Sequence, residues 1–324
     1  MSERVAVVGC GLVGSGWAIV FARAGCQVAL YDSESGAAEA ARDRIAQNLN
    51  ELSRHNLVVN PEAMLARIVV SCSLADALAD AAYVQESVFE RVAIKRAVFA
   101  EIDAVLGSTT VVGSSSSGIP ASSFTADVAC RNRCLVAHPV NPPYLIPVVE
   151  LVPAPWTDPA ALEDVHRLMQ RMGQVPVLLA REIEGFILNR LQGALLNEAW
   201  RLVGEGYATV EDVDLTVSHG LGLRWSFMGP FETIDLNAPG GVADYARRLG
   251  PLYERIATSD APPRGWSDEL IAEVERQRRA LLPRRRLTER TQWRDRRLMT
   301  LATHRREIER SESAEREMSA ATEG

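Results

Sequence analysis

The chain has 324 residues and a mass of 35.4 kDa, which is long enough for two domains of ordinary size. Hydrophobic residues make up 47% and charged residues 24%, a composition typical of a soluble globular protein and not of a disordered one. The formal charge of −7 and the scattered basic residues outside the C-terminal region exclude a domain-wide basic surface, so we expect no nucleic-acid partner.

The N-terminal sequence MSERVAVVGCG contains a hydrophobic run that ends at a glycine. This run is too short for a signal peptide or for a membrane-spanning helix. We therefore expect a cytoplasmic protein with no membrane partner.

Strand and helix patterns alternate in the first half of the sequence. Residues 4–8 are β-rich and lead into glycines, residues 12–24 have a helical pattern, and residues 27–31 form a second strand. Further strands are predicted at 67–71, 82–86, 110–113, 133–137 and 175–179, and further helices at 34–54, 74–80, 91–105 and 158–172. This alternation predicts an α/β fold with a Rossmann-type doubly wound parallel sheet, covered by helices on both faces.

The second half of the sequence is mainly helical after a proline-rich, extended segment that follows His138. Helices are predicted at 186–205, at 210–219 and from Gly229-Pro230 onward. The last fifty residues mix arginine and glutamate with apolar residues, which predicts an amphipathic helix that packs back on the helical domain. We therefore divide the chain into a nucleotide-binding domain, residues 1–182, and a mainly α-helical C-terminal domain, residues 183–324.

Five cysteines lie in the first 134 residues without a Cys-x-x-Cys pair, which fits a reducing compartment. Cys130 and Cys134 are four residues apart, a spacing that invites comparison with a metal site. No second ligand pair follows them, so we expect buried apolar side chains and no metal.

The segment GCGLVG follows the first strand and opens the first helix. It fits the G-x-G-x-x-G pattern of dinucleotide-binding sites, in which the three glycines allow a tight turn, close approach of a pyrophosphate and close helix packing. Asp32 ends the next strand, where a carboxylate accepts ribose hydroxyls and repels a 2′-phosphate. We therefore expect NAD as the cofactor, bound by Gly9, Gly11, Leu12, Val13, Gly14 and Asp32.

His138 and Glu150 are the second group of candidate functional residues. His138 ends a predicted strand, at the edge where open α/β sheets bind ligands, and an imidazole is a natural base for removing a hydroxyl proton. A carboxylate on the other ring nitrogen would fix the tautomer and stabilise the imidazolium. Taken alone, His138 is equally a packed structural histidine and Glu150 a strand-edge charge, but beside a dinucleotide motif they indicate alcohol dehydrogenation.

Several segments together resemble a known family. They are GCGLVG, Glu90 with Lys95, the serine run 114–117, AHPVNPPYLIPVVELVP, GFILNRLQ and GLGLRWSFMGPFET. On these segments the chain resembles the 3-hydroxyacyl-CoA dehydrogenase superfamily over nearly its whole length, and it is most similar to the lambda-crystallin branch, the L-gulonate 3-dehydrogenases. The resemblance implies a two-domain subunit whose helical domain forms a homodimer, with the substrate between the domains.

The resemblance also implies roles for individual residues. It implies that His138 is the catalytic base with Glu150 as its partner, and that Ser116 and Asn189 hold the reacting oxygen. Because the serine run continues into Gly118, Ser115 and Ser117 stay open as alternatives to Ser116.

Three more residues are implied to contact the cofactor. Glu90 and Lys95 are implied to lie along it, with Lys95, the single lysine of the sequence, as a point charge near the nicotinamide ribose. The alternative for Lys95 is a solvated helix position. Asn141 is implied to lie close to the nicotinamide.

Arg224 is a candidate receptor for a substrate carboxylate, because a guanidinium offers two parallel N–H donors. It lies in the helical segment where the resemblance places the substrate. The alternative is that Arg224 caps the preceding helix or pairs with a structural acid such as Glu232.

The function predicted from these features is NAD-dependent oxidation of a small L-3-hydroxy acid to the 3-oxo acid, and L-gulonate to 3-dehydro-L-gulonate is the preferred reaction. Alternatives are an L-3-hydroxyacyl-CoA dehydrogenase and a carnitine dehydrogenase. A non-enzymatic alternative is a structural, crystallin-like protein.

Overall fold

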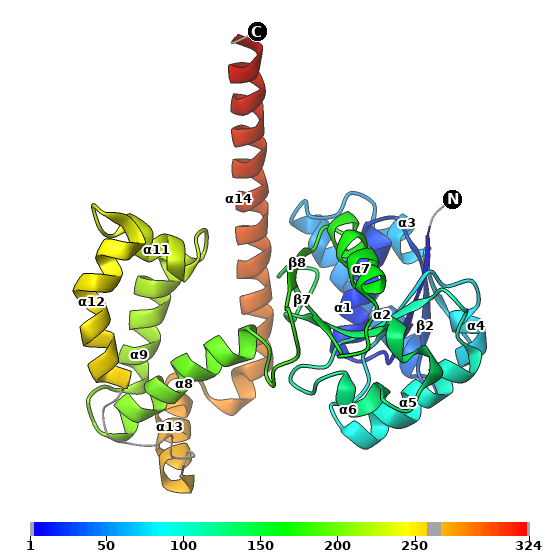
Figure 1. Ribbon diagram of the computed structural model, residues 1–324, viewed down its shortest axis with the longest axis horizontal. Coiled ribbons are helices and arrows are strands. Elements are labelled where there is room, and N and C mark those ends of the chain that lie inside the picture. The colour runs from blue at the N-terminus through cyan, green and yellow to red at the C-terminus, as the bar shows by residue number, and fades with distance from the viewer. Residues whose placement is uncertain (1–2, 258–266, 323–324) are drawn as a thin grey trace. The chain divides into compact units, whose positions relative to one another are not determined.

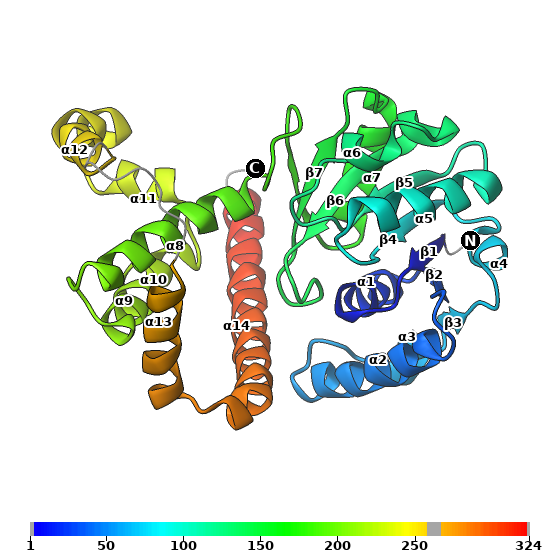
Figure 2. The same cartoon turned by 90° about the horizontal axis from the view of Figure 1, so that it is seen from below.

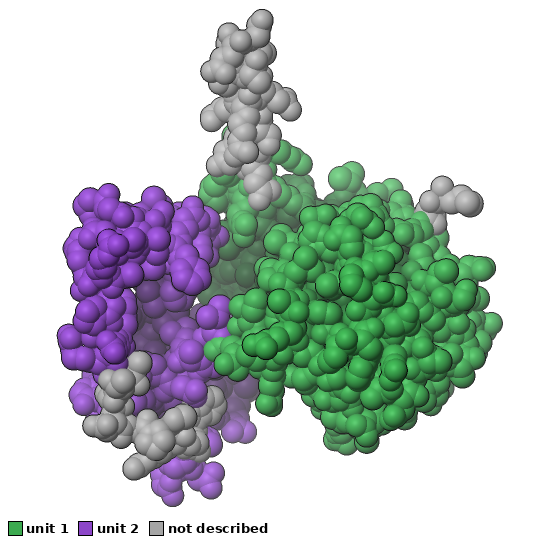
Figure 3. All heavy atoms as spheres, viewed as in Figure 1, with its two compact units in different colours: residues 1–190, 292–324 green, residues 191–291 purple. Residues whose placement is uncertain are grey.

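The computed structural model describes residues 3–257 and 267–322 of the chain. It divides into two compact units, which Figure 3 shows in different colours. The first consists of residues 1–190 and 292–324, and the second of residues 191–291. The predicted domain boundary at residue 182 stays a prediction.

The first unit is built on one eight-stranded sheet with the order β3-β2-β1-β4-β5-β6-β7-β8 (Figure 1). Every neighbouring pair is parallel except β6 with β7. The predicted α/β fold with a doubly wound sheet is therefore confirmed. The strands are β1 (Arg4–Val8), β2 (Gln27–Tyr31), β3 (Ile68–Val70), β4 (Tyr83–Glu86), β5 (Val111–Ser114), β6 (Cys134–Pro139), β7 (Val148–Pro153) and β8 (Val175–Leu178).

Helices cover both faces of this sheet (Figures 1 and 2). Alternate residues of β1 point to opposite faces, so that Val5 and Val7 enter one hydrophobic cluster while Ala6 and Val8 enter the other. The helices of this unit are α1 (Leu12–Arg23), α2 (Ala37–Arg54), α3 (Pro61–Leu65), α4 (Leu74–Leu78), α5 (Val92–Val105), α6 (Ser122–Thr125), the 3-10 helix η1 (Ala129–Arg133) and α7 (Pro159–Arg171).

The proline-rich segment after His138 contains the one clear departure from the predicted parallel sheet. It reverses the chain, and β7 returns antiparallel to β6 over the pairs from Leu135–Pro153 to Pro139–Val149. A parallel return would need a crossover of a dozen or more residues, whereas only residues 140–147 lie between the two strands. The short connection therefore forces the antiparallel pairing.

The second unit is helical, and no strand occurs among its described residues. Thr209 and Asp212 form a reciprocal capping box at the start of α9, and Ser267 caps α13. Its elements are α9 (Val210–Thr216), the π-helical turn Val217–Leu221, α10 (Gly222–Trp225), α11 (Pro230–Leu236), α12 (Gly241–Ala257), α13 (Asp268–Leu281) and η3 (Arg284–Arg286), and α8 (Leu188–Gly204) belongs to it from residue 191.

The final helix, α14 (Leu287–Thr322), differs from its prediction in what it packs against. Met299 is 3% exposed and lies in the hydrophobic cluster that contains α1 and α2. Thr303 and Arg306 donate hydrogen bonds to the carbonyls of His55 and Leu57, at the end of α2. The expectation that this helix packs on the helical domain is therefore wrong for these residues, because its apolar side chains complete the core beneath α2.

None of the described helices is both long and apolar enough to cross a membrane. The cytoplasmic location stays a prediction.

Candidate active site

The three glycines of the GCGLVG segment are required for different reasons. Gly9 has φ of 93°, and a Cβ there would lie 2.7 Å from the carbonyl carbon of Ser87. A Cβ on Gly14 would lie 2.0 Å from the Gly9 carbonyl oxygen. A Cβ on Gly11 would meet nothing within 4 Å, so packing within the protein does not demand glycine there. Open space at the middle glycine fits the close approach of a dinucleotide pyrophosphate.

Helix α1 begins directly after Gly11 and presents its first turn at this loop. Leu12 is 74% exposed at the start of the helix, whereas Val13 packs against the first hydrophobic cluster. The first N–H groups of a helix have no intrahelical acceptor and carry partial positive charge. The turn therefore suits the phosphates of a dinucleotide.

Asp32 fixes the shape of the same loop. Its two carboxylate oxygens accept hydrogen bonds from the Cys10 and Glu34 N–H groups at 2.7 and 3.0 Å. Arg44, which the sequence analysis did not single out, donates to the Cys10 carbonyl at 2.8 Å. Burial, together with the charge of Asp32, raises the pKa of the Cys10 thiol to about 12, so this thiol stays protonated.

The antiparallel turn brings His138 and Glu150 together. They are direct partners in the register of β6 and β7, and His138 Nδ1 lies 2.7 Å from Glu150 Oε2. Both side chains are buried. A neutral imidazole that donates Nδ1–H to the carboxylate keeps its Nε2 lone pair free to accept a proton.

Glu150 is held on its other oxygen by the start of α8. Its Oε1 accepts hydrogen bonds from the N–H groups of Ile187 and Leu188 at 2.8 and 2.9 Å. Burial acts to raise the pKa of Glu150, but the hydrogen bonds from His138, Leu188 and Ile187 outweigh it and hold this pKa below its ordinary value. The carboxylate therefore stays charged beside the imidazole.

The ring of Phe186 packs beside the imidazole of His138. Phe186 is fully buried with its ring centre 5.6 Å from that of His138, and its φ of 51° lies in the left-handed region. Such a conformation is rare for an aromatic residue and is held by the surrounding structure. The sequence analysis missed Phe186, although Gly185 beside it, with φ of 75°, marks a sharp turn before α8.

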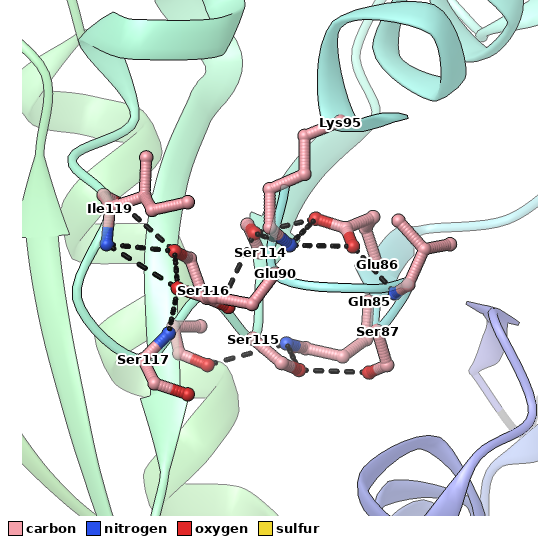
Figure 4. Close-up of polar contacts among 12 residues, drawn as sticks. Gln85, Glu86, Ser87, Glu90, Lys95, Ser114, Ser115, Ser116, Ser117 and Ile119 are labelled. Carbon is pink, nitrogen blue, oxygen red and sulfur yellow. Dashed lines mark hydrogen bonds and ion pairs between the residues drawn. The ribbon is translucent and has the colours of Figure 1, made fainter. Parts of the chain in front are cut away.

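The four serines that begin at the last residue of β5 have four different environments (Figure 4). Ser114 donates a hydrogen bond to Glu86, and the hydroxyl of Ser115 contacts Gln85 and Ser87. Ser116 is fully buried, and its hydroxyl lies 2.8 Å from Glu90 and 2.9 Å from the Ile119 carbonyl oxygen. The side chain of Ser117 is exposed.

Glu90 organises the serine loop. One oxygen of its carboxylate accepts hydrogen bonds from the Ser116 hydroxyl and from the N–H groups of Ser117 and Gly118, at 2.8, 2.9 and 3.1 Å (Figure 4). These donors form a concave nest of the kind that binds anions. Glu90 thereby fixes the loop that carries the predicted catalytic serine.

Lys95 is fully buried and is not a solvated helix residue. Its ammonium lies 2.9 and 3.0 Å from the two oxygens of Glu86 and 3.4 Å from the Ser114 hydroxyl, as Figure 4 shows. Glu86 ends β4 and Ser114 ends β5, so the ion pair joins the carboxyl ends of two neighbouring strands. Removal of one partner would leave a buried charge unpaired.

Asn189 and Asn141 are placed differently with respect to this loop. The Asn189 side-chain amide donates to the Ser117 carbonyl, which joins the start of α8 to the serine run. Asn141 is exposed in the turn between β6 and β7, and its side chain makes no hydrogen bond to the part of the chain that the structure describes. Segment 185–189 thus contacts both Glu150 and the serine loop.

Arg224 lies on α10 in the second unit, with its side chain exposed. It makes no ion pair with Glu232 or with any other acid whose side chain the structure describes. The structural alternative of a pairing with Glu232 is therefore not seen.

Cys130 and Cys134 are buried with their sulfur atoms 3.6 Å apart. Among the described residues, no cluster of three or more His, Cys, Asp or Glu side chains has the arrangement of a metal site.

The chain matches two family models that together cover most of its length. The model of the 3-hydroxyacyl-CoA dehydrogenase NAD binding domain matches residues 4–183, and that of the 3-hydroxyacyl-CoA dehydrogenase C-terminal domain matches residues 185–279. The predicted NAD cofactor is thereby confirmed.

Individual proteins of known name are similar over most of their length. The lambda-crystallin of Oryctolagus cuniculus is 39% identical over 94% of this chain and 97% of its own. An L-carnitine dehydrogenase of Streptomyces griseus is 41% identical over 77% of this chain and 74% of its own. The crystal structure of an NAD-dependent dismutase, 5-formyl-3-hydroxy-2-methylpyridine 4-carboxylic acid 5-dehydrogenase, has a TM-score of 0.75 with 28% identity, covering 95% of this chain and 99% of that one.

Proposed function

This chain belongs to the 3-hydroxyacyl-CoA dehydrogenase family, and from that membership we propose that it oxidises the free hydroxy acid L-gulonate to 3-dehydro-L-gulonate. An NAD-dependent hydroxyacyl or hydroxy acid dehydrogenase is the activity common to the family. The observation that carries the proposed chemistry is the buried His138–Glu150 pair, held at 2.7 Å with Nε2 of the imidazole unengaged by the described protein.

His138 acts in this proposal as the general base. NAD held by the glycine-rich loop and Asp32 would supply the acceptor for the hydride that leaves the carbinol carbon of the substrate. His138 Nε2 takes the proton of the hydroxyl on that carbon, and Glu150 stabilises the positive charge that forms on the ring. The N–H groups of Ile187 and Leu188 keep the Glu150 carboxylate in place while the ring charge changes.

Ser116 and Asn189 are proposed to hold the reacting oxygen. For Ser116 this requires its hydroxyl to exchange the contact with Glu90 for the substrate, because one hydroxyl has a single proton. Ser117 is the alternative, since its hydroxyl is exposed. A comparison of Ser116→Ala with Ser117→Ala decides between them: the variant with the larger fall in kcat at unchanged NADH affinity identifies the donor.

Glu90, Lys95 and Asn141 are proposed to support cofactor binding. For Lys95 the contacts with Glu86 and Ser114 favour an indirect role, in which the ammonium positions the strand ends that face the cofactor. Glu90 acts in the same way through the serine loop. Asn141, which is exposed, is proposed to reach the nicotinamide directly.

Arg224 is proposed to bind the carboxylate of the free acid. Its guanidinium is exposed and unpaired within the described residues, so it is available for a charged ligand. A bidentate pair with a carboxylate is among the strong hydrogen-bonded interactions of proteins.

A homodimer is proposed from the exposed apolar side chains of the second unit. Large apolar side chains gathered in a patch are unusual on a monomer, and a second copy of the chain would cover those of this unit. Members of this set include Leu191, Leu215, Leu223, Phe227, Phe231, Leu236 and Tyr253, all at least 47% exposed.

A carnitine dehydrogenase is the second candidate, favoured by the 41% identical relative of that name. The decisive experiment is a panel of substrates with NAD: L-gulonate, L-carnitine, L-3-hydroxybutyrate and L-3-hydroxybutyryl-CoA. A higher kcat/KM for L-gulonate than for the others supports the proposal, and a higher value for L-carnitine or the thioester replaces it. NADH binding without turnover of any of the four would favour a structural, crystallin-like role.

A further inference from the structure

Ser87 lies beside the glycine-rich loop, at the point where the strand order reverses. It directly follows β4, its N–H donates to the Val8 carbonyl at 2.7 Å, and its carbonyl carbon is the atom that a Cβ on Gly9 would meet. β1 lies between β2 and β4, so the connections that follow β1 and β4 lead toward opposite edges of the sheet. Ligands of open α/β sheets bind at this point.

A buried chain of hydrogen bonds leads to Ser87 from the interior. The Tyr83 hydroxyl donates to Gln85 Oε1 at 2.6 Å, and Gln85 Nε2 donates to the Ser115 hydroxyl at 2.7 Å and to the Ala137 carbonyl at 3.3 Å. The Ser115 hydroxyl lies 2.8 Å from the Ser87 hydroxyl (Figure 4). Gly113 makes room for this chain, because a Cβ there would lie 1.9 Å from the Tyr83 hydroxyl.

The donors and acceptors of this chain fix its direction. Gln85 Nε2 faces the Ala137 carbonyl, which only accepts, so the amide cannot be reversed. The indole N–H of Trp17, which only donates, also contacts the Ser115 hydroxyl, at 3.1 Å. Both lone pairs of Ser115 are therefore occupied, and its single proton must go to Ser87.

We propose that Ser87 donates its hydroxyl proton to an oxygen atom of bound NAD. Ser87 accepts from Ser115, and within the described part of the chain no protein acceptor contacts its own proton. The side chain is half-buried, and the Ser87 backbone packs against Gly9 of the glycine-rich loop. Trp17, Gln85 and Tyr83 act as positioning residues, since they direct the Ser115 proton to the Ser87 oxygen.

The test measures the Kd of NADH by fluorescence titration for the wild type and for Ser87→Ala. We expect Ser87→Ala to raise this Kd roughly tenfold, the loss of one hydrogen bond to a charged or strongly polar acceptor. Titration with ADP-ribose locates the acceptor: an equal loss assigns it to the pyrophosphate or ribose, and a loss confined to NADH assigns it to the nicotinamide amide. An unchanged Kd for both ligands overturns the proposal.

A second variant tests the direction of the chain without touching the ligand. In Gln85→Glu an oxygen replaces Nε2, so the Ser115 proton turns toward residue 85 and Ser87 must donate to Ser115. We expect this variant to weaken NADH binding, and Ser87→Ala to add little to it. Full additivity of the two changes overturns the proposed direction.

Ser73→Ala is the matched control. Ser73 caps α4 by accepting from the Asp76 N–H, so the variant also loses one serine hydrogen bond, but away from the loop. We expect the thermal unfolding temperature to fall without a change in the Kd of NADH. A rise in Kd equal to that of Ser87→Ala would show that the loss is structural and overturn the assignment.

Discussion

The two compact units bury apolar surface to very different extents. In the first unit, Trp17, Ile19 and Phe21 of α1 are fully buried. The side chains of β1 contribute to a hydrophobic cluster on each face of the sheet. In the second, α8 has no buried residue, and Phe227, Phe231 and Leu236 are 72%, 78% and 68% exposed. The first unit therefore completes its core within one chain, whereas the second leaves many large apolar side chains exposed.

The largest expected effect comes from a substitution in the first unit, at the imidazole of His138. We expect His138→Gln to lower kcat by a factor of about 10²–10⁴, because the general base is lost while the glycine-rich loop is untouched. The Kd of NADH, measured by fluorescence titration, should stay near the wild-type value. In Glu150→Gln kcat should fall less, because the imidazole remains. Wild-type turnover in His138→Gln would remove the histidine from the mechanism.

Arg224→Met asks whether the second unit also contributes to substrate binding. We expect the KM for the free hydroxy acid to rise by about 10- to 100-fold, because one charge-assisted interaction of roughly 1.5–3 kcal/mol is lost. Steady-state kinetics with an uncharged ester of the same acid should change much less. Equal rises in KM for the acid and for the ester would show that Arg224 only supports the fold.

The association surface is tested by placing a charge on it. We expect Phe231→Glu to shift the protein from dimer to monomer at micromolar concentration in light scattering, because a carboxylate would be buried in the contact. Phe89→Glu is the control, since Phe89 is 77% exposed in the first unit and should leave the dimer intact. A monomeric wild type, or a dimeric Phe231→Glu, would contradict the proposed surface.

The smallest expected effect is the pH dependence of stability from Glu150. Burial acts to raise the pKa of this carboxyl, but its hydrogen bonds hold the native value below the ordinary one. Its contribution is therefore complete above the ordinary pKa of about 4.3 and is lost as the pH falls through the lower native pKa.

Urea unfolding at neutral pH and near pH 3.5 measures this contribution. We expect the free energy of unfolding to fall more in the wild type than in Glu150→Gln over this interval. Glu62→Gln, an exposed change on α3, should follow the wild type. Equal pH dependence in all three proteins would show that Glu150 gains nothing from its hydrogen bonds.

The sequence predicted the local features of the site and missed those that depend on distant packing. The glycine-rich loop, Asp32 and NAD follow from a short motif, because neighbouring residues determine a strand, turn and helix. The antiparallel β7 was missed, since prolines in a short connection were interpreted as an extended segment. Ser115 and Trp17 are 98 residues apart, and no local pattern indicates that their side chains meet.

The contacts of Lys95 also depend on residues that are distant in the sequence. A single lysine was noticed in the sequence, but its partner Glu86 lies on a different element and carries no motif of its own. Only the pairing of β4 with β5 brings Glu86 and Ser114 to one ammonium. Phe186 was missed because burial against a histidine is decided by the turn at Gly185, not by residue type.

Gly113 can be replaced by a larger residue only when Tyr83 is replaced as well. A methyl group at 113 would overlap the Tyr83 hydroxyl, and so would any larger side chain. Because the ring carbon Cζ would also lie 2.9 Å from the new Cβ, relatives that carry alanine at the position of Gly113 should carry a side chain smaller than phenylalanine at that of Tyr83. In such a chain Gln85 Oε1 loses the Tyr83 donor, while Nε2 still faces the Ala137 carbonyl. Protein engineers who alter this strand pair would have to exchange both residues at once, and would thereby alter the hydrogen bonding at Ser87 from a distance.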